Sequence, residues 1–268
     1  MKDRLKVAVI QLSAGGDRDK NIHRAKMLVE RAARAGAEFV VLPEVFNCRR
    51  AFKRVHEIKE AGEAIPGPST KPFMEIARKA KITILAGSVL EKSHQRKAYN
   101  TSVLISPAGK ITAKYRKQNL FKAQVSGKSL HEAQFLLKGN KNVTARVQDF
   151  TIGLSICYDL RFVSMYEQYR QKGVDILCVP SSFTEKTGKA HWEVLLRARA
   201  IENQCFLLAP NQAGVDGRGV RTFGHSMIID PWGSIINRAG DEKEKTLYAT
   251  LSKDKIKKVK KILPLIRK

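Results

Sequence analysis

The chain has 268 residues, 43% of them hydrophobic, and carries 50 Lys and Arg against 25 Asp and Glu, a formal net charge of +25. This length and apolar content suffice for one large α/β domain or two small ones with a buried core. No stretch approaches about 18 consecutive apolar residues, which argues against a membrane-spanning helix. The N-terminal residues lack the apolar core of a signal peptide, so we expect a cytoplasmic protein.

The spacing of cysteines and histidines is not typical of metal or disulfide sites. The four cysteines include no CxxC pair, which argues against a disulfide framework and a structural zinc site and favours a reducing compartment. The six histidines show no ligand spacing, and no Gly-rich phosphate loop follows a strand. We therefore expect no metal and no cofactor. Cys178 and Cys205 lie within apolar runs and are expected to pack in the core.

The excess of basic residues makes a polyanion a candidate partner. The densest basic patch is the tail from Lys253 to Lys268, in which Asp254 is the single acid. No helix-turn-helix, ribonucleoprotein or zinc-finger signature accompanies it, so nucleic acid is not the expected partner. A solvated basic face is the favoured interpretation. A non-catalytic protein that binds polyanions through this surface is the alternative of a different class.

Strand and helix patterns alternate along the chain. Buried strands are predicted where apolar residues run continuously, at 5–12, 38–42, 82–90, 174–179 and 205–210. Helices are predicted at 19–35, 70–79, 162–171, 190–203 and, strongly basic, at about 253–263. Further strands and hairpins are predicted at 100–115, 143–150, 151–156, 224–236 and 246–251, and a long ordered loop at 122–142. No linker interrupts this order, which predicts a single α/β domain over residues 1–268 with helices on the outer faces of its sheets.

The stretch from Asp149 to Phe162 places a thiol at a strand-to-helix turn. Cys157 follows the strand at 151–156 and precedes the helix at 162–171. Helix N–H groups near such a turn lower the pKa of a thiol and stabilise an oxyanion. Cys157 is therefore a candidate nucleophile, although a cysteine in such a position can equally be a packing residue.

Two further chemical groups fall at strand ends. Glu44 follows Pro43 at the end of the strand at 38–42, the edge where α/β sheets carry their sites. Lys117 lies at the far end of the second strand of the first hairpin. Taken alone, each also fits a solvated surface position, because carboxylates and lysines are mostly exposed.

Five segments, in order along nearly the whole chain, together resemble the nitrilase (carbon–nitrogen hydrolase) superfamily. They are LPEVF at 42–46, YRKQNLF at 115–121, SICYDLRF at 155–162, AHWEVLLRARAIENQ at 190–204 and GHSMIIDPWG at 224–233. The resemblance implies a four-layer αββα sandwich and a homodimer or higher homo-oligomer. Within the superfamily, the segments look most like the amidase branch, which includes omega-amidases and the amidase of deaminated glutathione.

The family's catalytic Glu, Lys and Cys fall on Glu44, Lys117 and Cys157, and its second glutamate matches Glu132. The resemblance implies that Cys157 forms a thioester while Glu44 moves the protons. Lys117 and the Tyr158 backbone N–H are implied to hold the oxyanion, and Glu132 to orient Lys117 or the substrate nitrogen. The expected activity is hydrolysis of a small carboxylate-bearing amide to the acid and ammonia.

Arg161, four residues after the thiol, is a candidate clamp for the substrate carboxylate. An ion pair between Arg161 and Asp159 or another acid is the alternative. The chain departs from the family at Val163-Ser164 in place of Pro-Glu, at Asn119 in place of His and at Lys122 in place of an acid, which leaves the choice of amide open. A nitrilase or an N-carbamoyl hydrolase of the same superfamily is the alternative activity.

Overall fold

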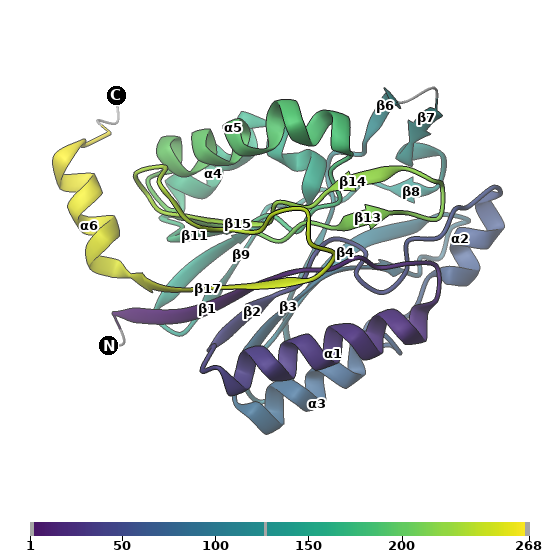
Figure 1. Cartoon of the computed structure of the whole chain (residues 1–268), viewed down its shortest axis with the longest axis horizontal. Helices are drawn as coiled ribbons and strands as arrows, with labels where there is room; N and C mark the ends of the chain where they lie inside the picture. The colour runs from purple at the N-terminus through teal and green to yellow at the C-terminus, as the bar shows by residue number, and fades with distance from the viewer. Residues whose placement is uncertain (1–2, 126–127, 266–268) are drawn as a thin grey trace.

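The structure is a computed structural model that describes residues 3–125 and 128–265. Two β-sheets pack face to face, and helices cover the outer face of each sheet (Figure 1). The predicted four-layer αββα sandwich is therefore confirmed. Arg267 and Lys268, at the end of the predicted basic tail, lie outside the described residues.

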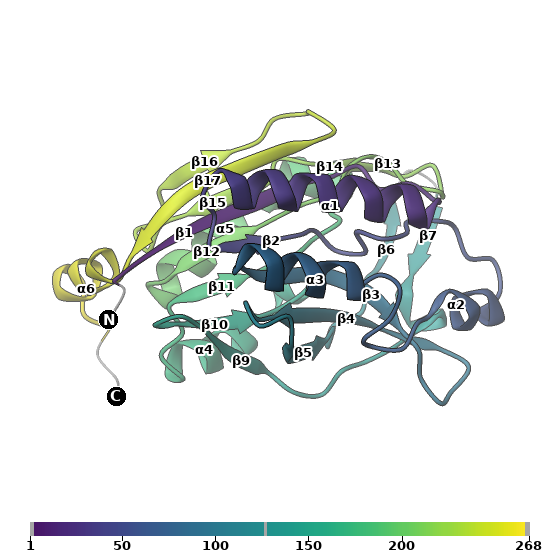
Figure 2. The ribbon, with the colours of Figure 1, turned by 90° about the horizontal axis from the view of Figure 1, so that it is seen from below.

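The first sheet has the strand order β17-β1-β2-β3-β4-β5, with β8 paired to β4. Its strands are β1 (Arg4–Gln11), β2 (Phe39–Val41), β3 (Thr83–Glu91), β4 (Ala98–Ile105), β5 (Ile111–Arg116), β8 (Leu136–Leu137) and β17 (Lys245–Ser252). The strands β1, β2 and β3 are parallel, so their carboxyl ends meet at one edge of the sheet. Helices α1 (Arg18–Arg34) and α3 (Lys71–Ala80) cover the outer face of this sheet (Figure 2).

The second sheet has the strand order β16-β15-β12-β11-β10-β9. Its strands are β9 (Val143–Val147), β10 (Phe150–Leu154), β11 (Ile176–Cys178), β12 (Phe206–Ala209), β15 (Met227–Ile229) and β16 (Ile235–Arg238). Helices α4 (Val163–Gln171) and α5 (Glu185–Asn203) cover its outer face (Figure 1). Helix α6 (Lys253–Ile262) projects from the end of the sandwich where both ends of the described chain lie (Figure 1).

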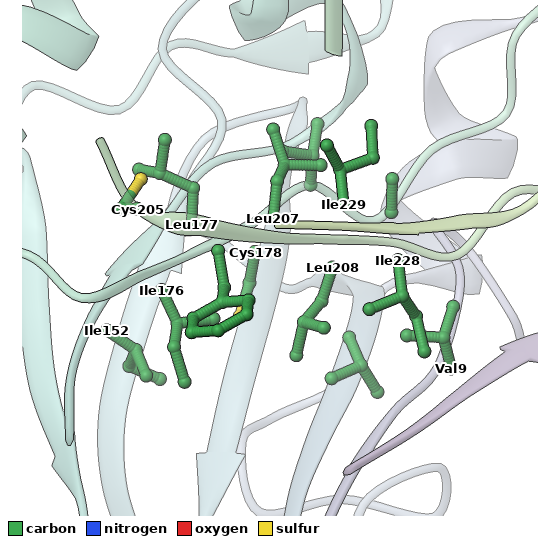
Figure 3. Close-up of a cluster of buried hydrophobic side chains, with 14 of the residues drawn as sticks. Val9, Ile152, Ile176, Leu177, Cys178, Cys205, Leu207, Leu208, Ile228 and Ile229 are labelled. Carbon is green, nitrogen blue, oxygen red and sulfur yellow. The ribbon is translucent and has the colours of Figure 1, made fainter. Parts of the chain in front are cut away.

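Alternating side chains of the second sheet fill two separate layers of the core (Figure 3). One set points toward Val9 of the first sheet: Ile152, Ile176, Cys178, Leu208 and Ile228. The other set points the opposite way: Leu177, Cys205, Leu207 and Ile229. Burial raises the pKa of the Cys178 and Cys205 thiols, which agrees with their predicted role as packing residues.

The predicted loop at 122–142 is wrong, because this segment contains regular structure. Strand β6 (Lys122–Val125) pairs antiparallel with β7 (Lys128–His131), and the 3-10 turn η1 (Glu132–Gln134) and β8 follow. Strands of four residues or fewer show too few alternations for a period to be visible. The strand pair β13 (Ala213–Val215) and β14 (Arg221–Phe223) was not predicted for the same reason. Helix α2 (Val55–Ala61) was also not predicted, because its seven residues make only about two turns and bury only Ile58 and Ala61.

Helix α5 begins at Glu185 rather than at the predicted residue 190. The side chain of Thr184 accepts a hydrogen bond from the Thr187 backbone N–H and so caps the helix. The first turn lacks an apolar residue, so hydrophobic periodicity alone placed the start too late.

Candidate active site

The four predicted catalytic residues come from one end of the sandwich and from both sheets. Glu44 lies in the turn after β2, and Lys117 directly follows β5. Glu132 begins η1, and Cys157 begins the 3-10 turn η2 (Cys157–Arg161) that follows β10. Glu44, Glu132 and Cys157 line one cavity of about 390 Å³.

Lys117 is the centre of a buried ion cluster. Its side chain is 0% exposed, and its Nζ lies 2.8 Å from Glu44 Oε1 and 2.9 Å from Glu132 Oε2. Burial acts to lower the pKa of Lys117, but Glu132, Glu44 and Cys157 outweigh it and raise this pKa well above its usual value. Lys117 therefore remains a cation, and the two carboxylates hold it at a fixed position.

Cys157 is held on a left-handed backbone turn. Its φ is 51°, a value that is uncommon for a residue other than glycine, and its N–H donates to Pro180 O at 3.0 Å. The turn is comparable to the serine elbow of the α/β-hydrolases, in which strained backbone presents the nucleophile.

The expectation that helix N–H groups lower the pKa of this thiol is wrong. Burial and the Glu44 carboxylate raise the pKa of Cys157 well above its usual value, against the opposing effect of Lys117. The following η2 turn has five residues, and its few N–H groups do not compensate for burial. The thiol therefore carries its proton in the resting protein and requires a base, and Glu44 lines the same cavity.

Tyr158 and Arg161 also line the cavity. The Arg161 guanidinium carbon lies 5.7 Å from the ring centre of Tyr158 and 5.5 Å from that of Phe183, and the group contacts His191 Nδ1 at 3.2 Å. An ion pair with Asp159, the predicted alternative, is not found among the described residues, because Asp159 accepts hydrogen bonds from other groups. Arg161 is thus placed on the wall of the cavity.

Sequence reasoning missed Asn100, which also lines the cavity. Its Nδ2 donates to Glu44 Oε1 at 2.9 Å, the same oxygen that accepts from Lys117. The available signal was a run of three polar residues, Asn100 to Ser102, inside a strand that is otherwise apolar or aromatic and in which every residue except Tyr99 is buried. Buried polar side chains in a strand need partners, and such a run indicates a polar site.

Within residues 3–125 and 128–265, no group of three or more His, Cys, Asp or Glu side chains is arranged to hold a metal ion. In the same part of the chain, no helix has the length and apolar character needed to cross a bilayer.

The carbon–nitrogen hydrolase family matches residues 6–261, and the chain belongs to this family. It is 35% identical over 263 residues to omega-amidase NIT2 of Homo sapiens, covering 98% of this chain and 94% of the relative. It is 39% identical over 266 residues to deaminated glutathione amidase of Synechocystis sp. (strain PCC 6803 / GT-S), covering 97% of this chain and 96% of the relative. Its fold is similar to that of Nit3 of Saccharomyces cerevisiae, a member of branch 10 of the nitrilase superfamily. The TM-score is 0.89, the sequence identity is 32%, and the match covers 99% of this chain and 96% of the Nit3 chain.

Proposed function

We propose that residues 1–268 form a single domain with cysteine-dependent amidase activity, which hydrolyses a small carboxylate-bearing amide to the acid and ammonia through a thioester. The observation that carries this proposal is the Lys117 ammonium, buried between the carboxylates of Glu44 and Glu132 beside a cavity that contains Cys157. Ionised groups buried in this way are costly unless they pair, and they concentrate at catalytic sites. The similar amidases support the same class of reaction.

Acylation begins when Glu44 takes the proton of the Cys157 thiol and the sulfur attacks the amide carbon. The C–S bond forms as the carbonyl π electrons move to oxygen. Lys117 and the Tyr158 backbone N–H stabilise this oxyanion. The N–H of Tyr158 lies in the first turn of η2, where amide groups have no partner within the turn. The C–N bond then breaks, Glu44 returns the proton to nitrogen, and ammonia leaves.

Deacylation uses the same carboxylate a second time. Glu44 takes a proton from water, whose oxygen attacks the thioester carbon. The second tetrahedral intermediate releases the acid by breaking the C–S bond, and the sulfur recovers the proton from Glu44. The role proposed for Glu132 is to hold Lys117 in place, because its Oε1 lies 3.0 Å from Nζ.

We propose that Arg161 binds the carboxylate of the substrate. Its position on the cavity wall, between two aromatic rings, suits a planar guanidinium that makes two parallel hydrogen bonds. Arg161→Lys is expected to raise KM for succinamate by about tenfold while KM for the neutral propionamide changes by less than about twofold. An equal change in KM for succinamate and propionamide would contradict the proposal that Arg161 binds the substrate carboxylate.

The amidase proposal is tested by ammonia release from succinamate, glutaramate and propionamide. Cys157→Ala is expected to abolish release while the far-UV circular dichroism spectrum is retained. Cys205→Ala is the matched control, because Cys205 is a buried thiol of the core, and it is expected to keep activity. Release of CO2 together with ammonia from a carbamoyl substrate, or hydrolysis of nitriles but not amides, would favour the alternative superfamily activities.

We further propose that the protein is a homodimer formed through the α4–α5 face and acts in the cytoplasm. Val163 and Val194 on these helices are 53% and 68% exposed, and Trp232 nearby is 51% exposed. Large exposed apolar side chains on one face are typical of a protein–protein interface. All four cysteines are free thiols, which is typical of proteins in a reducing compartment. Light scattering is expected to give a dimer for the wild type and a monomer for Val194→Glu.

A further inference from the structure

Asp159 connects the chain around Cys157 to the chain around Lys117. It lies two residues after Cys157, and its side chain is 0% exposed. Its Oδ2 accepts from Tyr115 Oη at 2.6 Å and from the Ile156 backbone N–H at 2.9 Å. Its Oδ1 accepts from the backbone N–H and the Nδ2 of Asn119, both at 2.9 Å.

The two side chains that donate to Asp159, from Tyr115 and Asn119, flank Lys117 in the sequence. Tyr115 lies two residues before Lys117, and Asn119 lies two residues after it. One carboxylate on η2 therefore holds the chain on both sides of the buried ammonium, and η2 itself begins with the thiol.

From this arrangement we propose that Asp159 is a positioning residue that sets the separation between the Lys117 ammonium and the Cys157 sulfur. The inference rests on the proposed function, because it assigns the role of Asp159 within the same catalytic site. Lys117 follows a strand of the first sheet and Cys157 follows a strand of the second sheet, so their separation depends on how the two sheets meet. Misplacement by about 1 Å costs about a hundredfold in rate, so a dedicated link between the two segments affects catalysis directly.

The groups that form the link differ in how they titrate. Burial raises the pKa of the Asp159 carboxyl above its usual value, and the hydrogen bond from Tyr115 acts in the opposite direction. Burial and the neighbouring Asp159 carboxylate raise the pKa of Tyr115 well above its usual value, so the phenol remains a donor. The side-chain amide of Asn119 donates to the carboxylate and does not titrate. Hydrogen bonds to a charged acceptor are stronger than neutral ones, and four of them converge on Asp159.

The experiment compares two buried tyrosines that each lose only a hydroxyl group. Tyr115→Phe removes a donor to Asp159, and Tyr169→Phe removes a hydroxyl that bonds to Leu154 O and Val143 N instead. Asn119→Leu, at a half-buried position, removes the second side-chain donor and keeps the backbone N–H. Each variant is measured for stability in urea, for kcat and KM with succinamate, and for the rate at which iodoacetamide alkylates Cys157 between pH 6 and 9.

We expect Tyr115→Phe and Asn119→Leu each to lower kcat and the alkylation rate by about tenfold, with KM within about threefold of wild type. Asp159→Asn is expected to lower both rates by about a hundredfold, because its amide group places a donor against the donors that the carboxylate accepts from. Tyr169→Phe is expected to lose comparable stability and to keep both rates within about twofold. If all the variants lose stability but alkylate and turn over like wild type, Asp159 has only a structural role.

The alkylation rate separates this inference from the proposed function. Absence of ammonia release from every amide in the wild type would overturn the amidase assignment. The same protein would still show whether loss of the Asp159 contacts changes the reactivity of Cys157, because iodoacetamide requires no amide turnover.

Discussion

Replacement of Lys117 by methionine removes the one cation of the buried cluster and keeps a side chain of similar length. Glu44 and Glu132 then lose a shared partner that lies 2.8 and 2.9 Å from their oxygens. Breaking a buried pair by removing one partner typically costs about 3–5 kcal/mol. We therefore expect Lys117→Met to lower the free energy of unfolding by about 4 kcal/mol at pH 7.

The loss is expected to depend on pH with a definite sign. Without the lysine, burial and mutual repulsion raise the pKa of the two-carboxylate pair in the folded state above its value in the unfolded chain. Groups shifted in this direction bind protons on folding, so they favour the folded state at low pH and destabilise it as pH rises. Lys117→Met should therefore lose more stability at pH 8 than at pH 5, and addition of Glu132→Gln should recover part of the loss.

Urea unfolding followed by tryptophan fluorescence measures this prediction. Lys114→Met is the matched control, because Lys114 lies on β5 close to Lys117 but is 43% exposed and pairs with Glu91 at 3.3 Å. An exposed pair of this kind contributes at most about 1 kcal/mol. If Lys117→Met and Lys114→Met are equally stable at both pH values, the buried ion cluster is not the organising feature of the site.

Three further outcomes follow from the structure. Burial acts to raise the pKa of Glu91, but hydrogen bonds from Arg116 and Thr101 outweigh it and lower this pKa to about 2. Glu91 therefore contributes about 2 kcal/mol to the free energy of unfolding, after allowance for its exposed basic partners, and this contribution should be lost as pH falls from about 4.5 to about 2. Acid unfolding of Glu91→Gln should lack this pH dependence. The rate of Cys157 alkylation should still increase with pH at pH 9, because burial raises the pKa of this thiol. Mass spectrometry of the labelled peptide measures this rate, and a plateau below pH 8 would contradict the raised pKa. Gly87→Ala should lower both stability and kcat, measured by urea unfolding and ammonia release, because an added Cβ would collide with the carbonyl of Pro43, next to Glu44.

The sequence was most informative where elements are long and periodic. Helix α1 buries Ile22, Leu28 and Val29 on one face, a pattern visible without tertiary information. The strands of the β6–β7 hairpin have only four residues each, and their segment shows no hydrophobic periodicity, so it was predicted as a loop. Short elements are stabilised by the contacts that they make in the folded chain, and local sequence carries little of that information.

In the candidate site, too, the features that lack a local sequence pattern were the hardest to predict. Glu44 and Lys117 could not be told from surface residues by local pattern, and only the order of motifs along the chain predicted that they meet. The contacts of Asp159 with Tyr115 and Asn119 join segments about 40 residues apart, and no local signal marks them. The shift in the pKa of Cys157 was predicted with the wrong sign, because burial of the thiol depends on the packing of both sheets.

The central claim is that Cys157 carries the acyl group of the substrate while Glu44 and Lys117 act on it. Rapid acid quenching of the protein during turnover of succinamate, followed by peptide mass spectrometry, tests this claim most directly. We predict a succinyl thioester on the peptide that contains Cys157, which builds up in the wild type and is absent from Cys157→Ala. Steady release of ammonia with no acyl group on Cys157 at any quench time would contradict it.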